Sequence, residues 1–186
     1  DAQTLARAAG TDTARFALLV ELASYLGWLA TTRDPADPQW RPTAEFDTAA
    51  SSPREQVWAD LVTAWLTHPV DVAHVLAGST PAGERIHLLG RDEHARTAFG
   101  GFPTARPQIL TLRRLLHVAL LREGGGRAVS EDDLVALLSF THPLLAAVRP
   151  NEVAQVLDEA ESFGLPASPL GHPDAHALTP IGRTLA

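Results

Sequence analysis

The chain of 186 residues has a formal net charge of −7, no cysteine and no lysine, so all 15 of its basic side chains are arginines. The absence of cysteine excludes disulfides, thiolate zinc sites and cysteine nucleophiles. The absence of lysine excludes the phosphate-cradling loop of a nucleotide-hydrolysing motor, and the negative charge argues against attraction to nucleic acid over the whole surface, although a local basic face is compatible with it.

No run of uncharged apolar residues approaches the roughly 18 that a membrane span requires, and no stretch has the order of a signal peptide. We therefore expect a soluble, cytoplasmic protein with no membrane partner. The chain contains no methionine, starts in a segment with the pattern of a helix, and ends just after a helix start at Thr179 and Pro180. From this we expect a fragment of a longer protein.

The first part of the chain has the pattern of a helix-turn-helix. A short amphipathic helix is expected over residues 2–9 with Leu5 facing inward, and a longer helix is expected over residues 14–26. The turn between them offers three candidate N-cap side chains, which are Thr11, Asp12 and Thr13. Residues 28–30 and 40–42 are then expected to form the two short strands of a wing.

This longer helix and its wing recur near the end of the chain. The apolar residues Phe16, Leu19, Val20, Ala23 and Leu26 are matched in register by Val153, Val156, Leu157, Ala160 and Phe163. Each helix then reaches a glycine, Gly27 or Gly164, suited to a left-handed C-terminal position. A polar, proline-rich loop follows in both copies, at residues 33–39 and 166–174. The repeat predicts a mainly α fold with two winged-helix units in tandem.

Between the two copies, local signals predict further helices. Serine, proline and glutamate at positions 52, 53 and 55 indicate an N-cap, a first helical position and a capping box. The helix that starts there is expected to bury Trp58 and Trp65 and to end at Pro69. Two shorter helices are expected at residues 70–77 and 91–99.

These signals divide the chain into three parts. We expect a first unit with its following helix at residues 1–78, an irregular connector rich in glycine and proline at 79–106, and a second unit at 107–186. The first helix of the second unit is defined by Ile109, Leu112, Leu116, Ala119 and Leu120, and it is expected to stop at the glycines 124–126. Ser130 caps the next helix, whose apolar positions are Leu134, Leu137 and Leu138, and Pro150 opens the third.

Two histidine groupings have the composition of metal sites. His68, Asp71 and His74 are spaced by three, but six residues of helix turn through about 600°, which points the two histidines to different sides. His172, Asp174 and His176 alternate near the second wing and converge only if that loop is ordered. We expect no metal, no cofactor, no small-molecule substrate and no enzymatic activity, because no nucleophile, base and orienting group occur together.

The third helix of a winged helix usually enters the major groove of DNA, and its wing contacts the backbone. In the second unit this helix, residues 151–163, carries Glu152, Asp158, Glu159 and Glu161 without an arginine, and we expect its surface to repel phosphate. The candidate contacts with the DNA backbone are therefore arginines elsewhere: Arg7, Arg15, Arg33, Arg41, Arg113, Arg114, Arg122 and Arg127. Solvated faces and local ion pairs are the alternative explanation for these residues.

The order of these motifs resembles that of the XPB-like helicase-associated proteins of actinobacteria. The similarity rests on W-A-x-L-V-x-A-W-L at residues 58–66, on L-x-E-A-E-x-x-G-L at 157–165 and on A-L-T-x-x-G-R at 177–183. The resemblance covers most of the chain and implies a DNA-repair or transcription setting with a non-catalytic, scaffold-like role. Helicase activity is not implied, because the motor motifs are missing.

The sequence thus supports two hypotheses about function. The first is a non-catalytic winged-helix module of a helicase-associated protein, which docks a protein partner in a DNA-processing complex and makes weak contacts with the DNA backbone through local basic patches. The second is a pure protein-protein interaction module that binds no nucleic acid, which the acidic third helix and the net charge favour.

Overall fold

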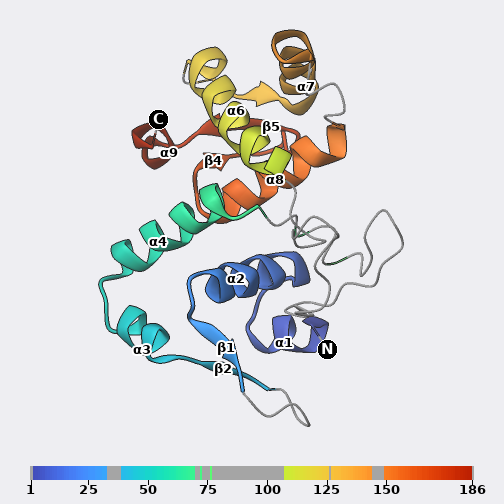
Figure 1. The fold of residues 1–186 in the computed structure, drawn as a ribbon. Helices are drawn as coiled ribbons and strands as arrows, with labels where there is room; N and C mark the ends of the chain where they lie inside the picture. Colours follow the sequence, from blue (N-terminus) through green and yellow to red (C-terminus); the bar gives the residue numbers. More distant parts are fainter. Residues whose placement is uncertain are drawn as a thin grey trace. The chain divides into compact units, whose positions relative to one another are not determined.

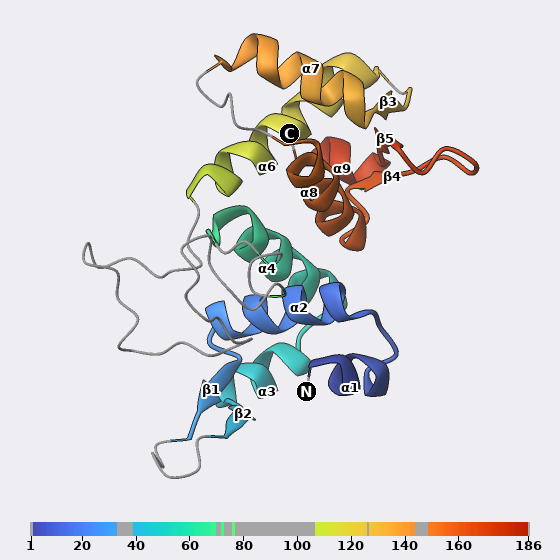
Figure 2. The same cartoon turned by 90° about the vertical axis from the view of Figure 1, so that its right-hand side faces the viewer.

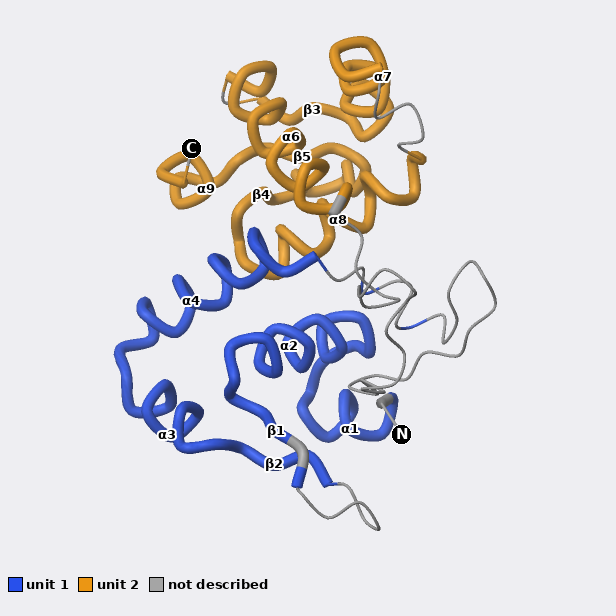
Figure 3. The backbone as a smooth tube through the Cα atoms, in the orientation of Figure 1, with its two compact units in different colours: residues 1–106 blue, residues 107–186 orange. Residues whose placement is uncertain are grey.

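The computed structural model describes residues 2–32, 39–69, 107–125, 127–143 and 149–185, together with Val72 and Leu76. The described chain is mainly helical with small antiparallel sheets and forms two compact units, residues 1–106 and 107–186 (Figure 3). The division falls at residue 107, where the sequence places the start of the second unit. The expected helices at 70–77 and 91–99 and the connector at 79–106 lie outside the described residues, apart from Val72 and Leu76.

The first unit contains four described helices and one hairpin (Figure 1). Its elements are α1 (Ala2–Ala8), α2 (Thr13–Tyr25), β1 (Leu29–Thr31), β2 (Trp40–Pro42), α3 (Ala44–Ala50) and α4 (Arg54–Thr67). The two strands are antiparallel, with Ala30 opposite Arg41. The predicted helix-turn-helix and both short strands are therefore confirmed as elements, and Asp12 caps α2 by accepting a 2.8 Å hydrogen bond from the Arg15 backbone N–H.

The second unit interleaves three longer helices with three short strands (Figure 2). In chain order they are α6 (Pro107–Gly124), β3 (Val129–Ser130), α7 (Glu131–Thr141), α8 (Pro150–Ser162), β4 (Pro166–Ala167), β5 (Ala175–Leu178) and the short α9 (Pro180–Thr184). The strands form one antiparallel sheet in the order β3-β5-β4. The sequence did not predict β3, which pairs Val129 with His176. Its two residues are too few to show the alternation that marks a strand.

The core of the second unit is formed by the apolar faces of α6, α7 and α8. All of the apolar positions predicted for α6 and α8 are buried, as are Leu134 and Leu138 of α7, whereas Leu137 is half-buried. Ser130 caps α7 by accepting a hydrogen bond from the Asp133 backbone N–H, and Pro150 is the first residue of α8. These predictions are confirmed.

The buried face of α2 differs from the prediction. Ala17, Leu18, Glu21 and Leu22 are buried, whereas Leu19, which was expected inside, is 43% exposed. The sequence is apolar on nearly every side of this helix, so periodicity alone does not select a face. The contacts that α2 makes with α1 and α4 select it instead. On α1 the prediction for Leu5 is wrong in the same way, because Ala6 is the buried residue.

The two copies of the repeat end their helices with the same backbone geometry. Gly27 and Gly164 have φ values of 75° and 71°, in the left-handed region that glycine occupies without steric cost. In the first copy the Trp28 N–H donates to the Ala23 carbonyl at 2.8 Å, and in the second the Leu165 N–H donates to the Ala160 carbonyl at 3.2 Å. These are the bonds of a Schellman C-cap, as the sequence predicts.

A threonine makes the same two kinds of hydrogen bond in each copy of the repeat. The hydroxyl of Thr43 donates to the Gly27 carbonyl at 2.7 Å, and the hydroxyl of Thr179 donates to the Gly164 carbonyl at 2.6 Å. Each hydroxyl also caps the next helix, by accepting from the backbone N–H of Phe46 at 3.3 Å or of Gly182 at 3.1 Å. The repeat therefore extends to hydrogen bonds between residues 15 and 16 positions apart.

The capping box expected at residues 52–55 is not formed, although α4 starts at Arg54, close to the predicted position. Pro53 occupies the N-cap position and makes no side-chain hydrogen bond. The Ser52 hydroxyl instead donates to the Thr48 carbonyl at 3.0 Å. The reason is the helix α3, which ends directly before this point and leaves carbonyl groups that the neighbouring hydroxyl satisfies.

Candidate interaction surface of the second unit

Arg113, predicted as a DNA-backbone contact, is buried in the second unit. Its Nη2 lies 2.9 Å from Oε2 of Glu159, and the two side chains are 1% and 8% exposed. Gln155 donates a further 2.9 Å hydrogen bond from Nε2 to Oε1 of Glu159. The prediction is wrong for this residue, because Arg113 lies four positions after Ile109 and three before Leu116, on the core-facing side of α6. That spacing is the sequence signal that could have revealed it.

Most of the carboxylates that were predicted to make the surface of α8 acidic form hydrogen bonds or an ion pair within the unit. Glu159 is buried against Arg113, and the carboxylate of Glu161 accepts hydrogen bonds from the backbone N–H and the hydroxyl of Ser168 at 3.0 and 3.3 Å. Glu152 accepts a 3.3 Å hydrogen bond from the Arg149 backbone N–H. Of the four predicted carboxylates only that of Asp158 is exposed, whereas Glu152 and Glu161 are half-buried and Glu159 is buried, so the outer face of α8 is less acidic than expected.

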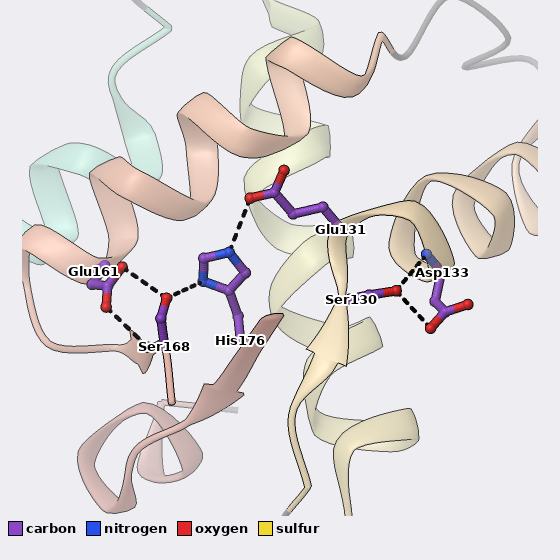
Figure 4. A network of polar contacts seen from close by, with 6 residues as sticks. All are labelled: Ser130, Glu131, Asp133, Glu161, Ser168 and His176. Atoms are coloured by element: carbon purple, nitrogen blue, oxygen red, sulfur yellow. Dashed lines mark hydrogen bonds and ion pairs between the residues drawn. The ribbon is translucent and has the colours of Figure 1, made fainter. Parts of the chain in front are cut away.

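A network centred on His176 holds the strands to α7 and α8 (Figure 4). His176 is fully buried, with its Nε2 3.1 Å from Oε1 of Glu131 and its Nδ1 3.3 Å from the Ser168 hydroxyl. The sequence of serine, histidine and glutamate has the composition of a nucleophilic triad. However, the Ser168 hydroxyl donates to Glu161, and the histidine is buried rather than open to a substrate. The arrangement is suited to fixing the β4–β5 hairpin in place.

The histidine grouping near the second wing is not assembled into a metal site. His176 points into the network just described, whereas His172 and Asp174 are exposed. The ring of His68 stacks on Tyr25 with the ring centroids 4.3 Å apart, and Asp71 and His74 lie outside the described residues. Among the residues that the structure describes, no group of three histidine or acidic side chains is placed to hold a metal ion.

The other predicted arginines of the second unit lie at its surface. Arg114, Arg122 and Arg127 are all exposed. Arg127 and Arg183 both line a hollow of about 150 Å³, which we call the arginine hollow. Arg183 was not among the predicted contacts. The hollow is lined by Leu120, Leu121 and Gly124 at the end of α6, by Gly125 and Arg127 in the segment that follows, by Leu178 of β5 and by Arg183 of α9.

In the first unit the predicted arginines are spread over separate elements. Arg7 is exposed in the last turn of α1, and Arg41 is exposed on β2, where it donates a 3.1 Å hydrogen bond to the Gln39 side chain. Arg15 is exposed and lies 3.6 Å from the carboxylate of Asp12. Arg33 lies outside the described residues. The described positions do not bring these arginines into one site.

Helix α9 is held close to the rest of the second unit by a glycine and a histidine. A Cβ atom added to Gly182 would lie 2.1 Å from the Leu165 carbonyl oxygen, so only glycine fits there. Burial lowers the pKa of His117 on α6, and a hydrogen bond with the Gly182 backbone acts in the opposite direction. The G-R dipeptide of the last sequence motif therefore serves packing through Gly182 and presents Arg183 to the arginine hollow.

Two large apolar side chains of the second unit stand in solvent. Leu170, in the loop that joins β4 and β5, is fully exposed, and Phe140 near the end of α7 is 86% exposed. The Leu170 loop is the counterpart of the wing predicted from the sequence, and it carries no arginine or lysine between Ser168 and Asp174. An apolar tip without basic side chains suits contact with protein better than contact with phosphate.

None of the described helices combines the length and apolar character that crossing a bilayer demands. A comparison of the chain with protein-family models, with curated proteins and with solved structures finds no match in any of the three.

Proposed function

We propose that the chain is a tandem winged-helix module of a helicase-associated protein, which acts without catalysis in DNA repair or transcription by docking a protein partner and by weak contacts with the DNA backbone. The order of α6, β3, α7, α8, β4 and β5 and the sheet order β3-β5-β4 support a winged helix in the second unit. The shared C-caps at Gly27 and Gly164 support a related unit in the first. The setting rests on the resemblance of the sequence motifs.

The surface formed by α8 and the β4–β5 loop carries this proposal. In winged helices that read DNA, this surface supplies basic and polar contacts to the groove and the backbone. Here α8 contains no arginine, and its Glu159 forms a buried ion pair with Arg113. The β4–β5 loop exposes Leu170 to solvent. An apolar anchor beside a weakly charged helix face is the composition of a protein-docking surface.

The test is a pull-down of partners from native lysate with and without nuclease treatment, using the wild type, Leu170→Ser and a control variant. Val118→Ser is a matched control, because Val118 is also an exposed apolar residue but lies on α6. We expect a partner that survives nuclease, is lost with Leu170→Ser and is retained with Val118→Ser. Loss of every partner after nuclease, or equal retention by both variants, would contradict the proposal.

The alternative function is protein interaction with no nucleic-acid contact at all, which the net charge of −7 favours. It differs from the first proposal in one measurable property. A fluorescence-anisotropy titration with duplex and single-stranded DNA at low and moderate salt separates the two. Binding at low salt that weakens with added salt supports backbone contact, whereas no binding at low salt supports the alternative.

A further inference from the structure

We propose that the arginine hollow binds the phosphate group of a sugar phosphate, the unit shared by a free nucleotide and a nucleic-acid strand. The site involves the end of α6, β5 and α9, and it uses neither α8 nor the β4–β5 loop. It therefore goes beyond the docking function proposed above and can succeed or fail independently of it.

The charges around the hollow favour an anion. Arg127 and Arg183 line it, and Arg122 lies on the last turn of α6 next to the lining residue Leu121. Within the described ranges, no acidic side chain lies within ion-pair distance of any of these three arginines, in contrast to Arg113 with its partner Glu159. Two negative contributions oppose these arginines. One is the carboxylate of Glu123, and the other is the C-terminal end of the α6 helix dipole, which is equivalent to about half an elementary charge. The two guanidinium groups that line the hollow outweigh these two contributions, and the charge of Arg122 on the same turn of α6 adds to them.

The volume of the hollow fits a phosphate group, and its apolar lining favours a sugar phosphate over a bare ion. A cavity of about 150 Å³ accepts a ligand as large as benzene, which has six heavy atoms, and a phosphate group has five. Guanidinium groups recognise phosphate through paired N–H donors. Beside them, the exposed side chain of Leu121 offers apolar surface to the carbon atoms of a sugar, and the buried Leu120 and Leu178 complete the apolar lining. Because Arg127, Arg183 and Leu121 are exposed, the site is open to solvent.

The first experiment is a titration of the full chain with ribose 5-phosphate, followed by backbone amide NMR signals. We expect saturable shifts confined to the residues around 120–127 and 178–183. In the double variant Arg127→Ala/Arg183→Ala we expect at least tenfold weaker binding, because each lost charge-assisted contact is worth about a factor of ten. The control Arg114→Ala/Arg149→Ala removes two other exposed arginines with the same change in charge and should bind like the wild type.

Unchanged dispersion of the amide signals shows that each variant is folded. The absence of shifts in the wild type, equal loss of binding in both double variants, or equal binding of inorganic phosphate and ribose 5-phosphate would each overturn the proposal. A labelled single-stranded oligonucleotide then identifies the source of the ligand. Displacement of the bound oligonucleotide by ribose 5-phosphate assigns the hollow to a nucleic-acid strand, whereas binding of ribose 5-phosphate alone assigns it to a free nucleotide or sugar phosphate.

Discussion

Arg113 on α6 and Glu159 on α8 form a buried ion pair at 2.9 Å, although the two residues are 46 positions apart in the chain. The pair joins the two helices. The pair changes the interpretation of both helices. It removes one arginine from the predicted contacts with the DNA backbone and one carboxylate from the predicted acidic surface of α8. It also accounts for charged residues at positions that otherwise belong to the apolar core.

Breaking this pair from one side should be strongly destabilising. Either Arg113→Met or Glu159→Met leaves one charge buried, and we expect a loss of about 3–5 kcal/mol in the free energy of unfolding. The double variant Arg113→Met/Glu159→Met should recover most of this loss, because both charges are replaced by apolar groups. Urea unfolding of the four proteins measures the cycle. Arg15→Met is the control, because its exposed pair with Asp12 should contribute about 0–1 kcal/mol.

Gly182→Ala should disturb the close contact of α9 with the backbone of Leu165, the residue before β4. The added methyl group would overlap the Leu165 carbonyl oxygen, so the backbone must shift at a cost of about 1–3 kcal/mol. Gly124→Ala is a matched control at the end of α6, because its Cβ would lie 3.9 Å from the nearest atom, a Val129 methyl group. Thermal unfolding should show a lower midpoint for Gly182→Ala only. Equal midpoints for the two variants would contradict the observed packing.

Replacing either capping threonine should lower stability by a similar amount, and the two effects can be measured separately. Thr43→Val and Thr179→Val each remove a helix N-cap and a bond to a glycine carbonyl, and each should cost about 1–2 kcal/mol, whereas Thr→Ser at either position should cost less. All four tryptophans precede residue 66, so tryptophan fluorescence reports on the first unit. Thr43→Val should lower the denaturant midpoint detected by fluorescence. Thr179→Val should lower the midpoint detected by circular dichroism and leave the fluorescence transition in place.

His117 predicts a loss of stability in mild acid. Burial lowers its pKa below the ordinary value of 6.5, so the unfolded chain takes up a proton at a higher pH than the folded chain does. The unfolded state is therefore favoured as the pH falls through about 6.5, and stability rises again with increasing pH. His117→Gln should flatten this dependence between pH 7.5 and pH 5, measured by urea unfolding. His172→Gln, at an exposed position, should leave it unchanged.

Several elements of the fold follow from signals that act over a few residues. The C-caps at Gly27 and Gly164 and the N-cap at Ser130 need only the residues within the next turn, and the sequence predicts each of them. The core faces of α6 and α8 were also predictable, because their apolar residues occupy one side of the helix while polar residues occupy the other. On α2 the apolar residues surround the helix, so their periodicity did not identify the buried face.

The candidate sites depended on contacts that no local pattern contains. Arg113 and Glu159 have the composition of surface residues, and only the packing of α6 against α8 places them inside. Arg127 and Arg183 lie 56 positions apart and meet because β5 returns the chain to the end of α6. By itself, then, the sequence determined most of the described helices, the C-caps at Gly27 and Gly164, the N-cap at Ser130 and the repeat, because backbone hydrogen bonds of helices and turns are local. The tertiary structure alone decided which charges are paired and which remain at the surface, because side chains distant in sequence neutralise each other only after the helices pack.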